Sequence, residues 1–416
     1  MKNSGIEWIG EIPDSWGLVR FKDICLNKKE VAGSNSADYE RLALTLNGVI
    51  KRPKDDSEGL QPKEFDGYQI IHENDFIFKM IDLQNISTSR VGLSPYMGLV
   101  SPAYIRFVPR KENQYNKFAY YLLMPLYYNC VYNSLGGNGV RSALNATDMG
   151  QFKIPYPSLE AQKKIVSFLE QKFVTVDELI SNQEKQIEKL KEYKQSVITE
   201  AVTKGLDKSA PFKDSGILHI GQIPLHWRVK KHKYVFKKEK ILCEKYAGED
   251  ILSLTMNGVI VRDLDNPMGK MPTTFDGYQY VKEGNLLLCL FDIDVTPRCV
   301  GVIKNNGLTS PAYSQYRIIS GDNVNYFYYL LLALDFKKDL LYLSKNLRSS
   351  LSDENFGLIE TIIPPSQEQQ QIVDYLDEKC GQIDRLIAIK QEKIEKLQEY
   401  KKSLIYEYVT GKKEVV

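Results

Sequence analysis

The chain contains one charged, amphipathic segment twice, and this duplication limits its possible architectures more than any other feature. Residues 187–198 read IEKLKEYKQSVI and residues 394–405 read IEKLQEYKKSLI, a separation of 207 residues in a chain of 416. Duplicated sequence folds into duplicated structural units. The spacing therefore predicts two copies of one unit, each about half of the chain.

Further pairs of blocks show that the repeat extends along the whole chain. They follow the same order in both halves, and their separation falls from 211 residues to 207, as short loop deletions in the second copy would produce. The paired blocks are SGIEWIGEIPDSW from Ser4 and SGILHIGQIPLHW from Ser215, LTLNGVI from Leu44 and LTMNGVI from Leu254, FDGYQ from Phe65 and Phe275, and LVSPAY from Leu99 and LTSPAY from Leu308.

Each copy begins with a globular part of mixed composition. Short apolar runs broken by Gly, Pro, Asn and Asp predict strands, and residues 117–133 predict a helix with a tyrosine-rich face. We interpret these tyrosines as core residues rather than as a platform for base stacking. The predicted fold class is mixed α/β (α+β).

Each copy ends with a long helical segment. After Pro157 the apolar residues recur mostly three, four or seven positions apart with charged residues between them, which predicts one long helix with an apolar seam. The second copy repeats this pattern. The predicted domains are a first globular domain at 1–157, a first helix at 158–206, a second globular domain at 207–365 and a second helix at 366–416.

The two helices are expected to pair with each other as a coiled coil. Each would be roughly 65 Å long at 1.5 Å per residue, too long to bury its seam against its own domain. The second globular domain links the end of the first helix to the start of the second, and a compact domain of this size cannot span roughly 65 Å. The pairing is therefore predicted to be antiparallel, with a pseudo-twofold axis that brings residue 1 near residue 416.

Composition narrows the class of protein. The formal net charge is +2, so any contact with nucleic acid must come from local patches. No apolar stretch approaches the roughly 20 residues that span a bilayer, and no signal peptide is evident, so a cytoplasmic location without a membrane partner is expected. Six scattered cysteines without a CxxC pair predict free thiols and no metal site, and the four histidines are interpreted as surface or packing residues.

No catalytic motif is present. The chain lacks a GxxxxGK[ST] phosphate loop, a GxGxxG segment after a strand and a GxSxG elbow. The nearest approach to the four-residue motif of base-modifying methyltransferases is IPPS at 363–366, which lacks both the polar first residue and the aromatic last one. We predict no catalytic and no cofactor-binding residue, which leaves binding as the function.

Two related heads on a twofold frame suit duplex DNA, whose half-sites are read at a spacing set by the protein. A helical rod of roughly 65 Å could separate two readers by more than one DNA turn of about 34 Å. The loops differ between the copies: NGVIKRPKDD at 47–56 corresponds to NGVIVRDLDN at 257–266, and GGNGVRSALN at 136–145 to LSKNLRSSLS at 343–352. Different loops on a shared frame predict two different half-sites, although an ordinary solvated role fits any single loop residue equally well.

A globular unit, then PYPSLEAQKKIVSFLEQK, then IEKLKEYKQSVITEAVTKG, all repeated, resembles the specificity (S) subunit of a type I restriction-modification system. The resemblance covers essentially the full chain. It implies two target-recognition domains that read the halves of a bipartite, asymmetric double-stranded DNA target, with the helices as spacer. It also implies two methyltransferase (M) subunits, which carry S-adenosylmethionine and methylate adenine, and ATP-dependent restriction (R) subunits with magnesium. This chain would be non-catalytic and hold no cofactor.

Within this resemblance, the Gly-rich segment 136–145 corresponds to a recognition loop, although Gly136 and Gly137 become Ser344 and Lys345 in the second copy. The identical SPAY blocks are assigned to the frame, because identical residues cannot distinguish two half-sites. Arginine and lysine in polar loops suit phosphates and base edges. The residues predicted to contact DNA are Lys51, Arg52, Lys79, Arg90, Arg141, Arg262, Arg298, Lys345 and Arg348.

Two other functions are compatible with the sequence. One is a non-enzymatic coiled-coil adaptor whose two heads bind protein rather than DNA, and the other is an enzyme whose site carries no recognisable motif. A gel shift with random-sequence duplex, with and without a methyltransferase subunit, distinguishes the three.

Overall fold

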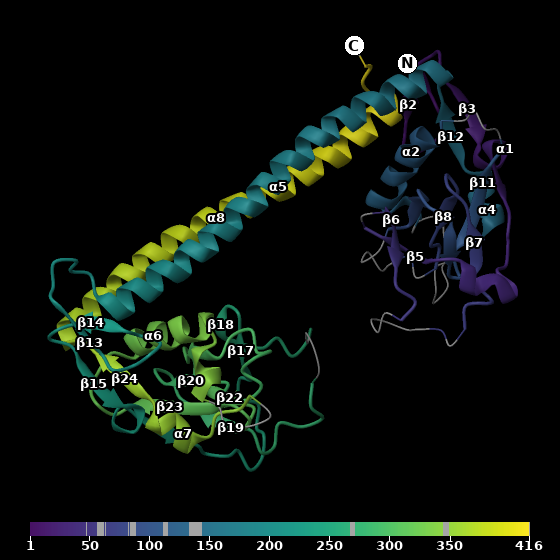
Figure 1. Cartoon of the computed structure of the whole chain (residues 1–416). Coiled ribbons are helices and arrows are strands. Elements are labelled where there is room, and N and C mark those ends of the chain that lie inside the picture. Colours follow the sequence, from purple (N-terminus) through teal and green to yellow (C-terminus); the bar gives the residue numbers. More distant parts are fainter. Residues whose placement is uncertain are drawn as a thin grey trace. The chain divides into compact units, whose positions relative to one another are not determined.

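The computed structural model describes residues 1–46, 48–55, 62, 64–81, 83, 89–110, 115–132, 144–266, 271–343 and 349–415. These form two compact units (Figure 1). Unit 1 comprises Met1–Gln183 and Glu392–Val416, and unit 2 comprises Glu184–Gln391. Nowhere in the described ranges does a helix have the length and apolar character needed to span a bilayer.

Unit 1 contains two four-stranded sheets, ordered β4-β11-β8-β9 and β6-β5-β10-β7. Its strands are β1 (Lys2–Asn3), β2 (Glu11–Ile12), β3 (Gly17–Arg20), β4 (Cys25–Asn27), β5 (Arg41–Thr45), β6 (Gly48–Arg52), β7 (Gln69–Ile71), β8 (Phe76–Phe78), β9 (Val91–Leu93), β10 (Gly98–Val100), β11 (Ile105–Pro109) and β12 (Lys153–Tyr156). Its short helices are α1 (Phe21–Ile24), η1 (Gly33–Asp38), α2 (Asn116–Tyr128) and α4 (Ala146–Gln151).

In unit 2 the sheet β16-β23-β20-β21 matches β4-β11-β8-β9 strand for strand, whereas the strands that correspond to β6-β5-β10-β7 form two separate pairs, β17-β18 and β19-β22. Its strands are β13 (Phe212–Asp214), β14 (Gln222–Pro224), β15 (Arg228–Lys231), β16 (Phe236–Glu239), β17 (Leu252–Thr255), β18 (Gly258–Val261), β19 (Gln279–Val281), β20 (Leu286–Leu288), β21 (Val300–Val302), β22 (Gly307–Thr309), β23 (Ser314–Ile318) and β24 (Glu360–Ile363). Its short helices are η2 (His232–Tyr234), α6 (Val324–Phe336), η3 (Asp339–Leu343) and α7 (Asp353–Leu358).

Two long helices, α5 (Leu159–Lys204) and α8 (Ser366–Val409), each contribute one half to each unit. In unit 2, Lys194 binds Asp384 and Gln186 binds Lys390, so the residue number rises on one helix as it falls on the other. In unit 1, Lys401 pairs with Asp177 and the Tyr408 ring lies 4.6 Å from the Phe168 ring, which gives the same opposed order. The helices lie antiparallel within each unit, which confirms the predicted pairing (Figure 1).

The start of each long helix is held by a buried glutamine. Gln162, 2% exposed, donates from Nε2 to the carbonyl oxygen of Pro157 at 2.9 Å. Gln369, fully buried, donates to Pro364 in the same way, also at 2.9 Å. The bond ties the first helical turn to the proline before it, which explains why the proline and glutamine recur in both copies.

The end of each long helix is a glycine with positive φ, 74° at Gly205 and 71° at Gly411. The repeated block that begins each unit, residues 4–16 in unit 1 and 215–227 in unit 2, is called the opening block. A side chain at either glycine would collide with the opening block of its own unit. A Cβ on Gly205 would lie 3.3 Å from the Trp227 ring, and one on Gly411 would lie 3.2 Å from the Trp16 ring. Glycine is therefore required by conformation and by close packing. The C-terminal end of each long helix therefore packs closely against the opening block of its unit.

Each unit has its own large apolar core, and both long helices enter it. In unit 1, Ile165 and Leu169 of α5 share the core with Leu404 and Val409 of α8. The core of unit 2 has the corresponding composition, with α5 and α8 in exchanged roles. The duplication and the mixed α/β class predicted from the sequence are confirmed.

The repeated FDGYQ and SPAY blocks meet in each unit. The amide of Gln69 donates to the carbonyl oxygen of Tyr104 at 2.7 Å, and that of Gln279 donates to Tyr313 at 2.7 Å. Both glutamines are almost completely buried. This shared bridge supports the assignment of the SPAY blocks to the frame.

Candidate nucleic-acid interface

The hairpin β5–β6 of unit 1 carries a concentration of positive charge. Arg41 lies directly opposite Arg52 in the antiparallel register, so the two side chains share one face. Like charges placed opposite one another cost stability. A bound anion would offset the repulsion between the two guanidinium groups, so this pair suits an anion-binding surface.

Two lysines extend this basic surface. Lys51 pairs with Glu40 at 2.5 Å and lies 5.2 Å from the Tyr96 ring centroid, and the Glu40 carboxylate raises the pKa of Lys51 above its ordinary value. The ammonium of Lys54 donates to the carbonyl oxygen of Ser36 at 2.8 Å. Both lysines, with Arg41 and Arg52, line a hollow of about 470 Å³. These cationic side chains suit a phosphodiester backbone.

The corresponding hairpin of unit 2, β17–β18, has different chemistry. Val261 and Leu264 stand where unit 1 has Lys51 and Lys54, and they are 41% and 39% exposed. The position of Arg41 is taken by the buried Ile251. Arginine persists only at Arg262, whose backbone N–H donates to the carbonyl oxygen of Ile251 at 2.7 Å. The two units therefore present unlike surfaces on one frame.

Lys51 and Arg52 are the only pair of predicted contacts that the described chain places together on one exposed hairpin. The sequence prediction omitted Arg41 and Lys54. Lys54 follows Lys51 and Arg52 in the same loop, so its charge was visible. Arg41 begins a separate strand, and only the strand register places it beside Arg52.

Arg90 is 1% exposed, and its guanidinium donates to the carbonyl oxygen of Ile81 at 3.0 Å. Lys79 is half-buried, and its backbone N–H donates to the carbonyl oxygen of Arg90 at 3.0 Å. This placement favours a structural role for Arg90, which holds the segment that follows β8. DNA contact by Lys79 stays a prediction.

Arg298 of unit 2 is half-buried and donates to the Tyr328 hydroxyl at 3.3 Å, on a face formed with α6. The predicted contacts Arg141, Lys345 and Arg348 lie outside the described residues, as does most of the loop 136–145. DNA contact by these residues stays a prediction.

The tyrosines of α2 pack against the core of unit 1, as predicted. Burial raises the pKa of Tyr121 and Tyr128 well above the ordinary value. Lys402 lies 5.4 Å from the Tyr128 ring centroid, so that ring already faces a cation of its own unit. These rings therefore form part of the core and not a stacking platform.

Comparison with known proteins agrees with this duplicated frame. A family model described as the type I restriction modification DNA specificity domain matches residues 13–189 and 300–399, one segment in each copy. The chain belongs to this family. It is a DNA-specificity protein of the type I restriction-modification class, and the adaptor alternative is not favoured.

Individual relatives support this assignment over most of the chain. A Methanocaldococcus jannaschii protein proposed to be the specificity subunit of the type I restriction enzyme MjaX is 25% identical over 429 residues, covering 97% of this chain and 95% of that one. The MjaVIII specificity subunit of the same organism is 30% identical over 284 residues, 62% of each chain. A solved structure concerning complex assembly and conformational transition of the type I restriction-modification system shares the fold, with a TM-score of 0.65, 15% identity and coverage of 96% and 98%.

Proposed function

We propose that this chain is the DNA-recognition subunit of a type I restriction-modification complex and that its two units read the two halves of a bipartite, asymmetric target. The proposal rests on the observation that corresponding hairpins of the duplicated fold carry different side chains. The β5–β6 hairpin of unit 1 is basic, and the β17–β18 hairpin of unit 2 is largely apolar. A shared frame supplies the same approach to DNA, and unlike surfaces contact the two halves of the target differently.

The chain itself performs no covalent step in this proposal. Two methyltransferase subunits bring S-adenosylmethionine and methylate adenine, and restriction subunits bring ATP and magnesium. The complex acts in the cytoplasm on double-stranded DNA. In this proposal the antiparallel helices act as the spacer between the two half-sites.

Exchange of one recognition domain tests whether each unit reads one half of the target. We expect a chimera that carries residues 1–157 of a relative to change one half of the selected sequence and to leave the other half and the gap unchanged. The measurement is selection from random duplex DNA by the chain co-expressed with its methyltransferase subunit. The reciprocal exchange of residues 207–365 is the control. A change in both halves after either exchange contradicts separate reading.

The basic hairpin has a sharper test, because unit 2 supplies its own replacement residues. We expect Lys51→Val with Lys54→Leu to weaken binding of all sequences alike and to lower the slope of log affinity against log salt by about one per lost phosphate contact. The matched variant Val261→Lys with Leu264→Lys adds the same charges to unit 2. An unchanged salt slope in the first variant means that β5–β6 does not meet the DNA backbone.

A further inference from the structure

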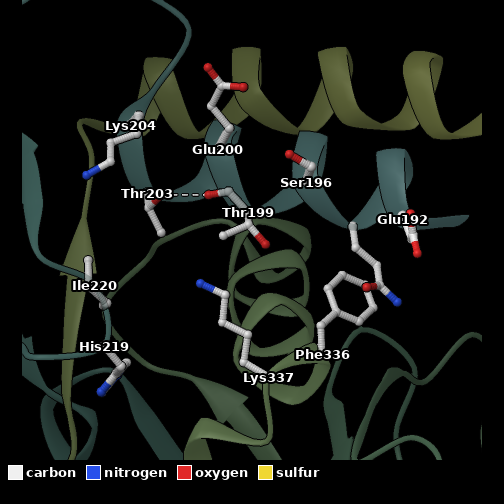
Figure 2. Close-up of a pocket in the computed structure, with 11 residues that line it drawn as sticks. Glu192, Ser196, Thr199, Glu200, Thr203, Lys204, His219, Ile220, Phe336 and Lys337 are labelled. Atoms are coloured by element: carbon white, nitrogen blue, oxygen red, sulfur yellow. Dashed lines mark hydrogen bonds between the residues drawn. The ribbon is translucent and has the colours of Figure 1, made fainter. Parts of the chain in front are cut away.

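Unit 2 contains an open pocket of about 550 Å³ beside the C-terminal part of α5 (Figure 2). Ser196 and Thr199 of α5 line one side, Phe336 and Lys337 at the end of α6 line another, and His219 of the opening block contributes to the third. In Figure 2 the Lys337 side chain points toward Thr199. The volume lies within the range of roughly 300–1,000 Å³ that is common for ligand pockets.

The repeat shows what the corresponding place in unit 1 contains. Thr199 corresponds to Tyr406, and His219 corresponds to Trp8. In unit 1 the Tyr406 hydroxyl donates to the carbonyl oxygen of Trp8 at 3.1 Å, and Trp8 packs against the core of that unit. Two aromatic side chains therefore lie where unit 2 has a threonine and a histidine. Unit 2 therefore has the same helix and opening block at this position but lacks the two aromatic rings.

The charges around the pocket balance. Glu192 and Glu200 contribute two carboxylates, and Lys204 and Lys337 contribute two ammonium groups. An ion of either sign gains little from such a set. A neutral group with an apolar body and one hydrogen-bonding atom fits better, because hydroxyl and charged side chains line the pocket together with the apolar Ile220 and Phe336. Tyrosine and tryptophan side chains have this character.

The chain next to the pocket favours a protein as the source of that group. Leu218, the neighbour of His219, is 101% exposed, whereas the corresponding residue of unit 1 is Glu7. A single exposed leucine is ordinary on a protein surface. Beside a pocket, and in place of a charged residue, it extends the apolar area that an interface would cover.

We propose that this pocket receives a tyrosine or tryptophan side chain of a methyltransferase subunit that docks on unit 2. The inference rests on the proposed function for the existence of that partner. It makes the two units unequal as docking sites, since unit 1 fills the same place with its own Tyr406 and Trp8. Aromatic anchors seated in pockets carry a large share of binding energy in protein interfaces.

Small analogues of the two side chains test the pocket in the isolated full chain. We expect 4-methylphenol and 3-methylindole to bind saturably in ligand-observed NMR, with a dissociation constant that is roughly millimolar for molecules of this size. Butyrate and butylammonium should show at least tenfold weaker binding. Thr199→Tyr, which places the unit 1 residue in the pocket, should abolish binding of both aromatic probes. Probe binding that is absent, or that survives in Thr199→Tyr, overturns the proposal.

The same substitution tests the partner. We expect Thr199→Tyr to weaken assembly with the co-expressed methyltransferase subunit on the order of 10- to 100-fold, as loss of a hot-spot contact does. Gln371→Tyr is the matched control, because it adds the same ring at an exposed neutral position of α8 outside the pocket. Thr199→Ser keeps the pocket open and should assemble as the unaltered chain does. Equal assembly by Thr199→Tyr and Gln371→Tyr contradicts the inference.

DNA selection separates this result from the proposed function. If the unaltered complex selects a sequence and Thr199→Tyr assembles normally, the aromatic pocket is wrong and DNA recognition stands. If the unaltered complex shows no preference among sequences, DNA recognition by this chain is wrong, and the assembly of Thr199→Tyr against Gln371→Tyr still decides the docking proposal.

Discussion

Units 1 and 2 stabilise the same place in their main sheets by different means. In unit 1, the buried Arg106 donates from Nε to Asp75 at 2.7 Å and from Nη1 to Glu30 at 2.8 Å. The corresponding residues of unit 2 are Gln315 and Asn285, and the Asn285 amide donates to the Gln315 side-chain oxygen at 3.1 Å. The bridge between these segments is therefore an ion pair in unit 1 and an amide–amide hydrogen bond in unit 2, where Asn285 also donates to the Glu239 carboxylate at 3.1 Å.

The largest expected effect comes from exchanging only one partner of this bridge. Asp75→Asn introduces the unit 2 residue but leaves Arg106 charged and 3% exposed. Removing one partner of a buried ion pair costs about 3–5 kcal/mol when the remaining charge has no other partner, and we expect the lower end of this range because Arg106 keeps its 2.8 Å bond to Glu30. We expect this loss in the free energy of unfolding of unit 1, measured by hydrogen exchange resolved along the chain.

The double exchange Asp75→Asn with Arg106→Gln sharpens the comparison. It transfers the Asn–Gln amide bond of unit 2 into unit 1 and should recover most of the lost stability, because the buried charges of Asp75 and Arg106 are both removed. The reverse pair, Asn285→Asp with Gln315→Arg, is the control in unit 2. A double variant as unstable as Asp75→Asn would show that the two sites are not interchangeable and that the surroundings of Arg106 have become adapted to charge.

A second difference between the units concerns the residue that follows β3 in unit 1 and β15 in unit 2. Phe21 is completely buried among aromatic rings in unit 1, and His232 is 1% exposed in unit 2, with its ring 4.8 Å from that of Phe236 and 4.5 Å from that of Phe356. Desolvation lowers the pKa of His232 from its ordinary 6.5 to about 3. The folded state of unit 2 therefore favours the neutral form of this histidine.

The pH dependence has a definite sign. Because the pKa is lower in the folded state, the unfolded chain binds the proton more tightly between pH 6.5 and about 3. Stability is full above pH 6.5 and falls as the pH falls through this window. At pH 5 the loss is about 2 kcal/mol, at roughly 1.4 kcal/mol for each pH unit below 6.5.

His232→Phe, which introduces the unit 1 residue, should remove this loss. The difference in the free energy of unfolding between the variant and the unaltered chain should grow by about 2 kcal/mol from pH 8 to pH 5. Denaturant unfolding at both values measures it, and other titrating groups cancel in the difference. Phe21→His is the reciprocal variant and should give unit 1 the same acid sensitivity. A difference that does not vary with pH would mean that His232 is solvated when folded.

The sequence predicted the features that repeat or that follow a helical period, namely the duplication, the two long helices, their antiparallel pairing and the frame role of the SPAY blocks. It did not locate contacts that depend on strand register. Arg41 lies opposite Arg52 only through the β5–β6 pairing, and Asp75 meets Arg106 through a side-chain bond across 31 residues of sequence.

The burial of Arg90 could have been predicted from the sequence. It corresponds to Cys299, which is 1% exposed, and Lys79 corresponds to Cys289, which is 2% exposed. A position that carries cysteine in one copy and arginine in the other indicates a buried site, since cysteine is among the most buried residue types. Aligning the copies position by position would have marked Arg90 as an unlikely DNA contact, whereas its charge alone indicated the opposite.

The smallest expected effect concerns a feature that the two units share. Lys194 pairs with Asp384 at 2.7 Å in unit 2, and Lys401 pairs with Asp177 at 2.8 Å in unit 1. The four residues correspond through the repeat, and both aspartates are 56% exposed. Exposed ion pairs contribute only about 0.2–1 kcal/mol and weaken as salt increases. Lys194→Ala and Lys401→Ala should therefore each cost an amount in this range and become nearly neutral in molar salt.

The comparison between the units depends on whether the two ion pairs have equal coupling energies and less on how large those energies are. If the two lysines occupy equivalent places on one duplicated frame, their double-mutant coupling energies with Asp384 and Asp177 should agree within about 0.3–0.5 kcal/mol, the usual limit of additivity. Lys189→Ala, on an exposed face of α5, controls for the loss of a lysine from the same helix. Coupling confined to one unit would show that the helices are paired differently in the two units, and the equivalence on which the comparison rests would then hold for the globular parts alone.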